Sequence, residues 1–273
     1  MPVESKGQQN HQAKNQIAGL TVRIADFEDL KVALNAGFRD FTRRPVLSGF
    51  FGFVYALGGI MIFAALTIWG ETWMIIPVAV GFPLVAPFIA AGLYDISRRL
   101  ERGETFEASD VFTVVWNQQR RELGWMAFVV LFIFWLWMYQ IRLLLALFLG
   151  RQSFTSLSSL DGFLNIITTT QDGILFIVVG TFVGAILASV LFTTVVMAMP
   201  VLLDRDIDFI SAMILSFKSV AQSPFVMLSW GAFISAITIL AMIPVFVGLV
   251  FVLPVFGHAS WHLYRRLISP VAT

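Results

Sequence analysis

The chain has 273 residues, of which 58% are hydrophobic and only 13% are charged, and its mean hydropathy is +0.83. Soluble domains carry about 25% charged residues, so this composition predicts a polytopic membrane protein. The net charge of +1 gives no reason to expect a nucleic-acid partner, and the absence of cysteine excludes disulfides, thiolate metal sites and cysteine catalysis.

The first 22 residues are rich in Gln, Asn, Lys and Gly and offer no apolar face to bury. We therefore expect residues 1–22 to form a mobile cytoplasmic tail ahead of a single membrane domain over residues 23–273. The tail lacks the basic-then-apolar layout of a signal peptide. The first membrane span is expected to serve as an uncleaved membrane signal.

An amphipathic helix is predicted from about Asp26 to Arg44. Its apolar face consists of Ile24, Phe27, Leu30, Leu34, Phe38 and Phe41. Because a residue before proline is pushed out of the α region, Pro45 is expected to end this helix. Two similar helices are predicted over residues 109–121 and 206–222. The second of these starts with acidic residues, including Asp208, and ends before Pro224.

Six uncharged or nearly uncharged stretches are long enough to cross a bilayer, which takes about 20 residues. They cover residues 46–69, 74–94, 123–148, 173–203, 225–243 and 245–263, with a turn at Pro244 between the last two. The Ser- and Thr-rich loop before the fourth stretch can form a short helix over residues 160–167. The second stretch contains Pro77, Pro83 and Pro87, so it is either a bent packing helix or a discontinuous helix that lines a substrate cavity. The spacing of Gly180 and Gly184 in the fourth favours close approach of another helix.

The predicted fold is all-α, with six transmembrane helices and three cytoplasmic amphipathic helices arranged as parallel repeats over about 26–100, 105–203 and 206–267. The first and third units match best. Their aligned identities are Ala33 with Ala212, Phe38 with Phe217, Pro45 with Pro224 and Gly52 with Gly231. A helix followed by two spans is thus predicted to recur along the chain.

Positive charge fixes the predicted orientation. With six spans and a cytoplasmic N-terminus, only Arg142 and Arg151 of the 18 Lys and Arg residues fall on the outer side. Both termini and all three amphipathic helices are then cytoplasmic and lie beside anionic lipid headgroups, which attract basic residues.

Two histidines, His258 and His262, stand one helical turn apart in the last predicted span and can share a face. The repeat alignment places Asp95 opposite His262, so these three residues are the candidate ligands of a metal. The alternatives are one haem ligand, or two interfacial histidines at the end of a span beside Arg265 and Arg266.

Arg142 is the one formally charged residue inside a predicted span, and an intramembrane charge is a functional flag. It either snorkels to the outer surface or contacts an anion or substrate. Further basic residues are candidates for contact with a substrate or partner, namely Arg43, Arg44, Arg98, Arg99, Arg120 and Arg121. We predict no catalytic residue and no cofactor, and the lack of a mid-span acidic residue disfavours proton-coupled transport.

Four segments resemble a proteobacterial family of predicted integral membrane proteins with a domain of unknown function, some of them labelled after cytochrome c oxidase subunit I. The segments are DLKVALNAGFRDFTRRPVLSGFFGFVYALGG, PFIAAGLYDISRRLERG, WMYQIRLLLALF and LPVFGHASWHLYRRL. The resemblance implies a bacterial inner-membrane protein of six spans. Only two histidines lie near spans, both on one helix, so the ligands of a haem–copper centre cannot be assembled.

The function that these patterns favour is non-enzymatic: an accessory, assembly or membrane-organising factor. Its expected partners are membrane lipids and other membrane proteins, a respiratory-type complex among them, and not nucleic acid. The alternative is a small-molecule or lipid transporter or channel that uses the proline-rich span and Arg142. The third hypothesis is a metal- or haem-binding membrane protein.

Overall fold

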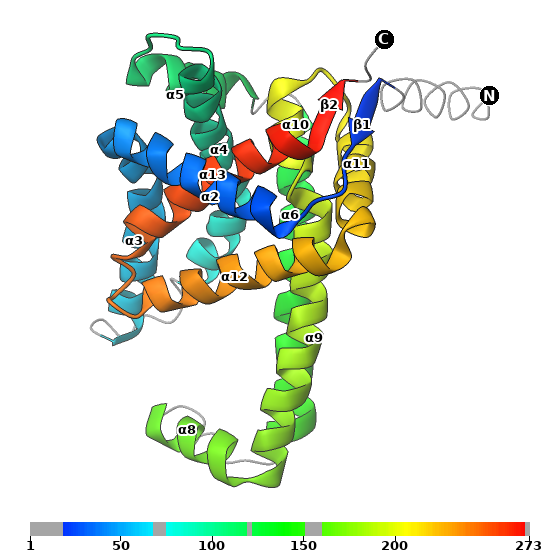
Figure 1. The fold of residues 1–273 in the computed structure, drawn as a ribbon. Coiled ribbons are helices and arrows are strands. Elements are labelled where there is room, and N and C mark those ends of the chain that lie inside the picture. Colours follow the sequence, from blue (N-terminus) through cyan, green and yellow to red (C-terminus); the bar gives the residue numbers. More distant parts are fainter. Residues whose placement is uncertain (1–18, 68–74, 119–121, 151–159, 271–273) are drawn as a thin grey trace, which may run out of the picture. The chain divides into compact units, whose positions relative to one another are not determined.

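The computed structural model describes residues 19–67, 75–118, 122–150 and 160–270, and these residues are mostly helical (Figure 1). The chain divides into two compact units. The first holds the described residues up to Phe128 together with those from Phe192 onward, and the second spans Val129–Leu191.

The first unit begins with helices α2 (Phe27–Arg43) and α3 (Pro45–Thr67). A capping box starts α2, since the Asp26 side chain accepts from Asp29 N–H and the Asp29 side chain accepts from Asp26 N–H. The predicted stop at Pro45 is confirmed, because α2 ends at Arg43 and α3 starts at the proline. The two helix axes differ by 104°.

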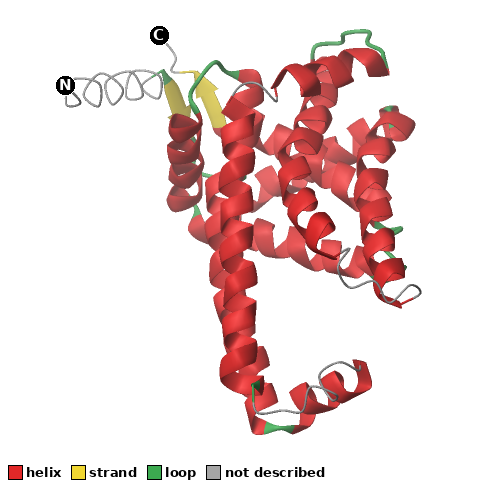
Figure 2. Cartoon of the chain, turned by 180° about the vertical axis from the view of Figure 1, so that it is seen from behind, coloured by secondary structure: helices red, strands yellow, loops and turns green. Residues whose placement is uncertain are grey.

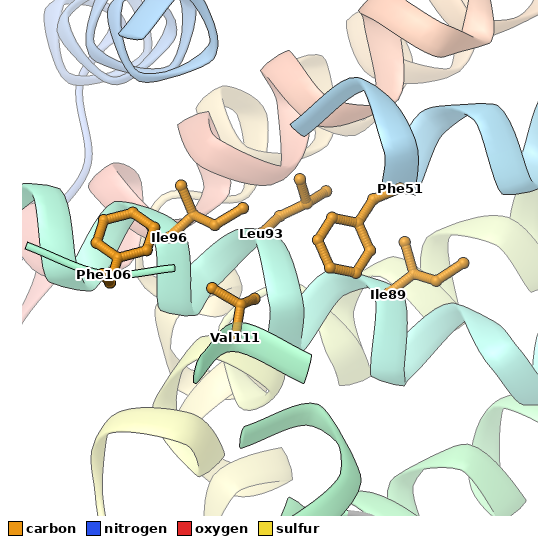
Figure 3. Packing of buried hydrophobic residues seen from close by; sticks show 6 residues of the cluster. All are labelled: Phe51, Ile89, Leu93, Ile96, Phe106 and Val111. Atoms are coloured by element: carbon orange, nitrogen blue, oxygen red, sulfur yellow. The ribbon is translucent and has the colours of Figure 1, made fainter. Parts of the chain in front are cut away.

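Helix α4 (Ile75–Glu101) follows, and it runs without a break through Pro77, Pro83 and Pro87. The hypothesis of a discontinuous helix here is therefore wrong. Helix α5 (Ala108–Gln118) comes next. The side chains of α3, α4, α5 and the α4–α5 connection meet in one apolar cluster (Figure 3), made of Phe51, Ile89, Leu93, Ile96, Phe106 and Val111.

The third predicted amphipathic segment forms α11 (Phe209–Gln222), preceded by the short helix α10 (Ala198–Asp204) and followed by α12 (Pro224–Met242). Asp208 caps α11 by accepting from Ser211 N–H, as its position at the start of the helix predicts. The predicted turn around Pro244 is present, with positive φ angles at Val245 and Phe246.

The last helix, α13 (Leu249–Leu267), packs against α2, α3, α4 and α12. Two glycines allow the contact. A Cβ added at Gly37 would lie 2.6 Å from the backbone nitrogen of Ala259, and one at Gly52 would lie 2.7 Å from the Leu249 carbonyl oxygen. The helices therefore meet backbone to backbone.

A two-stranded antiparallel sheet joins the two ends of the described chain (Figure 2). Strand β1 (Leu20–Val22) pairs with β2 (Ile268–Pro270), and Thr21 lies opposite Ser269. The tail predicted over residues 1–22 therefore ends in a strand. Residues 1–18 lie outside the described residues.

The second unit contains most of α6 (Glu122–Leu144), the π-helical turn η2 (Leu145–Leu149), α8 (Leu160–Thr169) and most of α9 (Gln171–Val195). Gly180 and Gly184 face α6, since a Cβ at either would come within van der Waals distance of Leu144 or Trp137, at 3.5 and 3.9 Å. The predicted short helix near Leu160 is present as α8.

By length and composition, three described helices can cross a membrane: Glu122–Leu149, Gln171–Asp204 and Pro224–Met242. A fourth crossing results if Phe27–Arg43 and Pro45–Met61 count as one broken span. Helix α13 covers most of the sixth predicted span but is not among these helices. The membrane character is thus established, whereas the count of six spans stays a prediction.

Candidate functional site

The face that α2 turns to the protein is made of small and polar residues. Ala33 and Asp40 are almost fully buried on it, and Gly37 touches the backbone of α13. The large apolar residues lie on the opposite side, where Phe27 is 55% exposed and Phe38 is 59% exposed. The sequence predicted an apolar face on this helix, but Leu30, which belongs to that predicted face, is buried at 8% exposure, and the packing of the opposite face was not predicted.

His258 is fully buried between two hydroxyl groups. Its Nε2 lies 2.9 Å from the Ser48 Oγ on α3, and its Nδ1 lies 2.8 Å from the Ser97 Oγ on α4. A neutral imidazole donates through one nitrogen and accepts through the other, so both ring nitrogens are satisfied. One side chain thereby links three helices.

His262, one turn further along α13, donates from Nε2 to the Asp40 Oδ2 at 2.6 Å. Burial by itself raises the pKa of the Asp40 carboxyl, but hydrogen bonds from His262 and Ser97 outweigh it and hold this pKa below its usual range. We call the five residues that join α2, α3, α4 and α13 the polar lock: Asp40, Ser48, Ser97, His258 and His262.

The polar lock contains a hydroxyl beside an imidazole, which is the pair that activates a serine nucleophile. Ser48, Ser97 and His258 are all fully buried, however, so no substrate reaches the Ser48 Oγ. A buried, satisfied polar network instead fixes the packing of the helices that it joins. The arrangement favours a structural role for both histidines.

The candidate metal ligands have separate partners. Asp95 is fully buried and accepts from Arg98 and from Arg99, the latter at 2.8 Å from Nε. The repeat alignment that paired Asp95 with His262 is wrong about this contact, because Asp40 occupies that position. Among the described residues there is no group of three or more His, Asp or Glu residues that could hold a metal ion.

The predicted contact arginines fall into three situations. Arg98 and Arg99 are bound to Asp95, and Arg98 also donates to the Leu203 carbonyl oxygen at 3.3 Å. Arg142 is exposed on α6 within the second unit. Arg120 and Arg121 lie outside the described residues.

Arg43 and Arg44 border a cleft of about 650 Å³ at the corner between α2 and α3. The Arg44 guanidinium lies over the Phe106 ring, 4.8 Å from its centroid. The cleft is lined by Arg43, Arg44, Pro45, Val46, Leu47, Phe50, Phe106, Glu107, Ala108 and Phe112. It therefore combines two guanidinium groups with an aromatic and aliphatic wall.

A second polar cluster surrounds the end of α13. The Tyr264 hydroxyl donates to Asp204 at 2.7 Å, and Glu101 accepts from Trp261 and Arg265, each at 3.1 Å. These bonds attach the last two turns of α13 to the ends of α4 and α10. Like the polar lock, this cluster is fully engaged in holding helices together.

Sequence reasoning missed Asp40, Ser48 and Ser97. One signal for Asp40 was present: Ala33, Ala36, Gly37 and Asp40 recur at helical spacing and form a small-residue face opposite the apolar one. Ser48 and Ser97 gave no such signal, since a single hydroxyl in a helix usually bonds to its own backbone.

Residues 75–204 match a family described as predicted integral membrane protein (DUF2189). The match begins at α4 and ends with α10, so it leaves out α2, α3 and α13 and hence most of the polar lock. No curated protein and no solved structure gave a significant match. The similarity supports an integral membrane protein and carries no activity with it.

Proposed function

We propose that the chain is a non-enzymatic accessory, assembly or membrane-organising factor of a bacterial inner membrane, of proteobacterial origin. In this proposal six helices span the bilayer in parallel repeats, and both termini and the helices α2, α5 and α11 are cytoplasmic. The bias of Lys and Arg toward that side supports the orientation.

The observation that carries the proposal is the outward apolar face of α2 and α11. Phe38 is 59% exposed and Phe217 is 63% exposed, while the opposite faces of both helices are packed inside the unit. A row of exposed aromatic and aliphatic side chains at a membrane surface suits the lipid interface or another membrane protein. The burial of the Ser48–His258 pair supports a role without catalysis.

The transporter hypothesis was based on a proline-broken span and on Arg142. The first of these observations no longer holds, because α4 is an unbroken helix. The other basis of this hypothesis, Arg142, is exposed, as both a snorkelling residue and a substrate contact would be.

Site-directed photocrosslinking tests the proposal in native membranes. The chain has no cysteine, so Phe38→Cys and Phe217→Cys each introduce one attachment point for a benzophenone reagent. We expect both variants to yield an adduct with the same discrete membrane protein. Phe182→Cys on α9, where the side chain is 66% exposed, is the matched control and should crosslink lipid only. Lipid adducts alone at all three positions would contradict an accessory role.

A further inference from the structure

The cleft at the α2–α3 corner has the chemistry of a site for an anionic amphiphile. Arg43 and Arg44 stand together at the end of α2, and the first turn of α3 also lines the cleft. The first N–H groups of an α-helix lack intrahelical acceptors and carry partial positive charge, which favours an anion. Two guanidinium groups add planar, multiple hydrogen-bond donors suited to a phosphate.

The two arginines are available for such a ligand. Among the described residues no carboxylate lies within ion-pair distance of either one, although Arg98 and Arg99 are bound to Asp95. Glu107 is the one acidic residue in the lining, so the cleft keeps a positive balance.

The remaining wall of the cleft is mostly apolar, with Phe106 buried and other side chains exposed. Val46 is 87% exposed, and Phe50 and Phe112 meet edge to face with ring centroids 5.4 Å apart. Val46 and Phe50 extend from the arginines along α3, which is a predicted membrane span, and Phe112 on α5 contacts Phe50. A ligand held there by a negative headgroup can lay an acyl chain along them.

We infer that this cleft binds one anionic phospholipid of the cytoplasmic leaflet. Its phosphate lies between Arg43 and Arg44, and its acyl chain runs along Val46, Phe50 and Phe112. The inference rests on the membrane placement in the proposed function and adds a defined lipid class and a defined site. The corresponding corner of the third unit carries Gln222 and Ser223, so it lacks the two charges.

Lipid binding by the purified full chain in a neutral detergent tests this site. Dioctanoyl phosphatidylglycerol, dioctanoyl phosphatidylcholine and inorganic phosphate serve as three separate probes, with bound molecules counted by native mass spectrometry. We expect phosphatidylglycerol to bind in preference to the other two. Arg43→Gln with Arg44→Gln should weaken it by about 25-fold, about fivefold for each arginine.

The matched control removes two basic residues elsewhere in the same unit, through Lys31→Gln and Lys218→Gln, and should bind as the wild type does. Arg43→Lys with Arg44→Lys retains the charge but loses the planar donors, so it should bind more weakly than the wild type and more tightly than the glutamine variant, which separates loss of the site from loss of folding. Glu107→Gln should bind more tightly.

Equal binding of phosphatidylcholine would reduce the site to an apolar groove and overturn the inference. Competition by inorganic phosphate at the same concentration, or an equal loss in the lysine control, would also overturn it. No partner protein is present in this experiment, so its failure would leave the crosslinking result for the proposed function untouched.

Discussion

The chain turns sharply at two corners of the first unit, one between α2 and α3 and one between α11 and α12. The two corners have the same backbone conformation but pack against different parts of the unit. Arg44 between α2 and α3 has φ −136° and ψ 58°, and Ser223 between α11 and α12 has φ −141° and ψ 59°. Each is followed by the proline that starts the next helix. The matched alanines, Ala33 and Ala212, are both fully buried. The corner itself is therefore set by a local signal, a helix end before a proline.

The interior faces of the corners are different. Where the first has Gly37 against the backbone of α13, the second has Ser216, which donates to the Thr193 carbonyl oxygen and accepts from Met197 N–H. Ser216 thus satisfies backbone groups at the break between α9 and α10. The same helix–proline–helix turn therefore packs against two different surfaces, and the interior residues, such as Gly37 and Ser216, determine which surface each turn contacts.

The aligned positions 48 and 227 show the same contrast. Ser48 contacts His258, whereas Met227 is fully buried as an apolar residue. At this aligned position the first corner makes a polar contact and the second makes an apolar one. Variants at the positions that differ between the two corners measure how much each set of contacts contributes to the free energy of unfolding.

The largest expected effect comes from His258→Ala. The change leaves a cavity and removes the partner of two buried hydroxyl groups, so the free energy of unfolding should fall by about 3 kcal/mol. Unfolding by SDS titration in mixed micelles, followed by tryptophan fluorescence, measures it.

Adding Ser48→Met to His258→Ala gives the first corner the side chain found at Met227 and refills part of the cavity. We expect the double variant to recover at least about 1 kcal/mol of the loss. A loss below about 1 kcal/mol for His258→Ala alone would show that the polar lock does not hold the helices.

The next effect concerns the close crossing of α2 and α13. Gly37→Ala places a Cβ within 2.7 Å of two backbone atoms of α13, and neither can move without shifting the helix. We expect a loss of about 2 kcal/mol in the same SDS titration.

Gly49→Ala is the control, because its Cβ would lie 3.7 Å from a Val250 methyl group, an ordinary contact. It should be neutral or slightly stabilising, as alanine favours a helix over glycine. Equal losses in both variants would contradict this expectation, because helix propensity favours alanine at both positions and only Gly37 lies at the close crossing.

These contacts mark the boundary of what the sequence could predict. Helix ends at Pro45 and Pro224, the cap at Asp208 and the turn near Pro244 follow from local chemistry and are confirmed. The short helix α8 and the membrane character follow from composition in the same way.

Contacts between distant helices could not be predicted. His258 and Ser48 are 210 positions apart, and no local pattern states which hydroxyl meets which ring. The repeat alignment pointed to Asp95 for His262, but Asp95 is held by two arginines of its own helix. Asp95 pairs with Arg98 and Arg99, which lie three and four residues away on the same helix, and it therefore does not pair with His262 as the alignment predicted.

A smaller effect on stability is expected from Asp29, in the first turn of α2, which aligns with Asp208 at the start of α11. Burial by itself raises the pKa of the Asp29 carboxyl, but hydrogen bonds from Asp26 N–H, Arg266 and Arg23 outweigh it and place this pKa below its usual value of 3.8. A lowered pKa in the folded state means that the stabilisation is complete above the unfolded value and is lost as the pH falls through the folded value.

The apparent Tm of the wild type should therefore fall as the pH decreases below about 4, and Asp29→Asn should make this fall less steep. Asp208→Asn keeps an N-capping side chain and should cost only a few tenths of a kcal/mol. An unchanged pH profile in Asp29→Asn would show that the ion pairs with Arg23 and Arg266 contribute nothing.

The smallest effect on stability is expected on the outward faces, where the two corners agree. Phe38 and Phe217 make few contacts inside the unit, so single cysteine substitutions there should change the free energy of unfolding by less than about 0.5 kcal/mol. Spin labels on Phe38→Cys and Phe217→Cys in bilayers then report the depth of each corner through their accessibility to oxygen and to a water-soluble nickel complex.

If the first and third units are parallel repeats, both labels lie at the same depth near the headgroups, and a label on Phe182→Cys lies deeper. Labels at Phe38 and Phe217 on opposite membrane surfaces would contradict the parallel repeat, because an odd number of crossings would then separate two corners with the same backbone. Equal depth on the cytoplasmic side would also place Arg43 and Arg44 at the leaflet that holds their inferred lipid. Both corners would then lie at the cytoplasmic surface, and only the first would carry the two arginines that attract an anionic lipid.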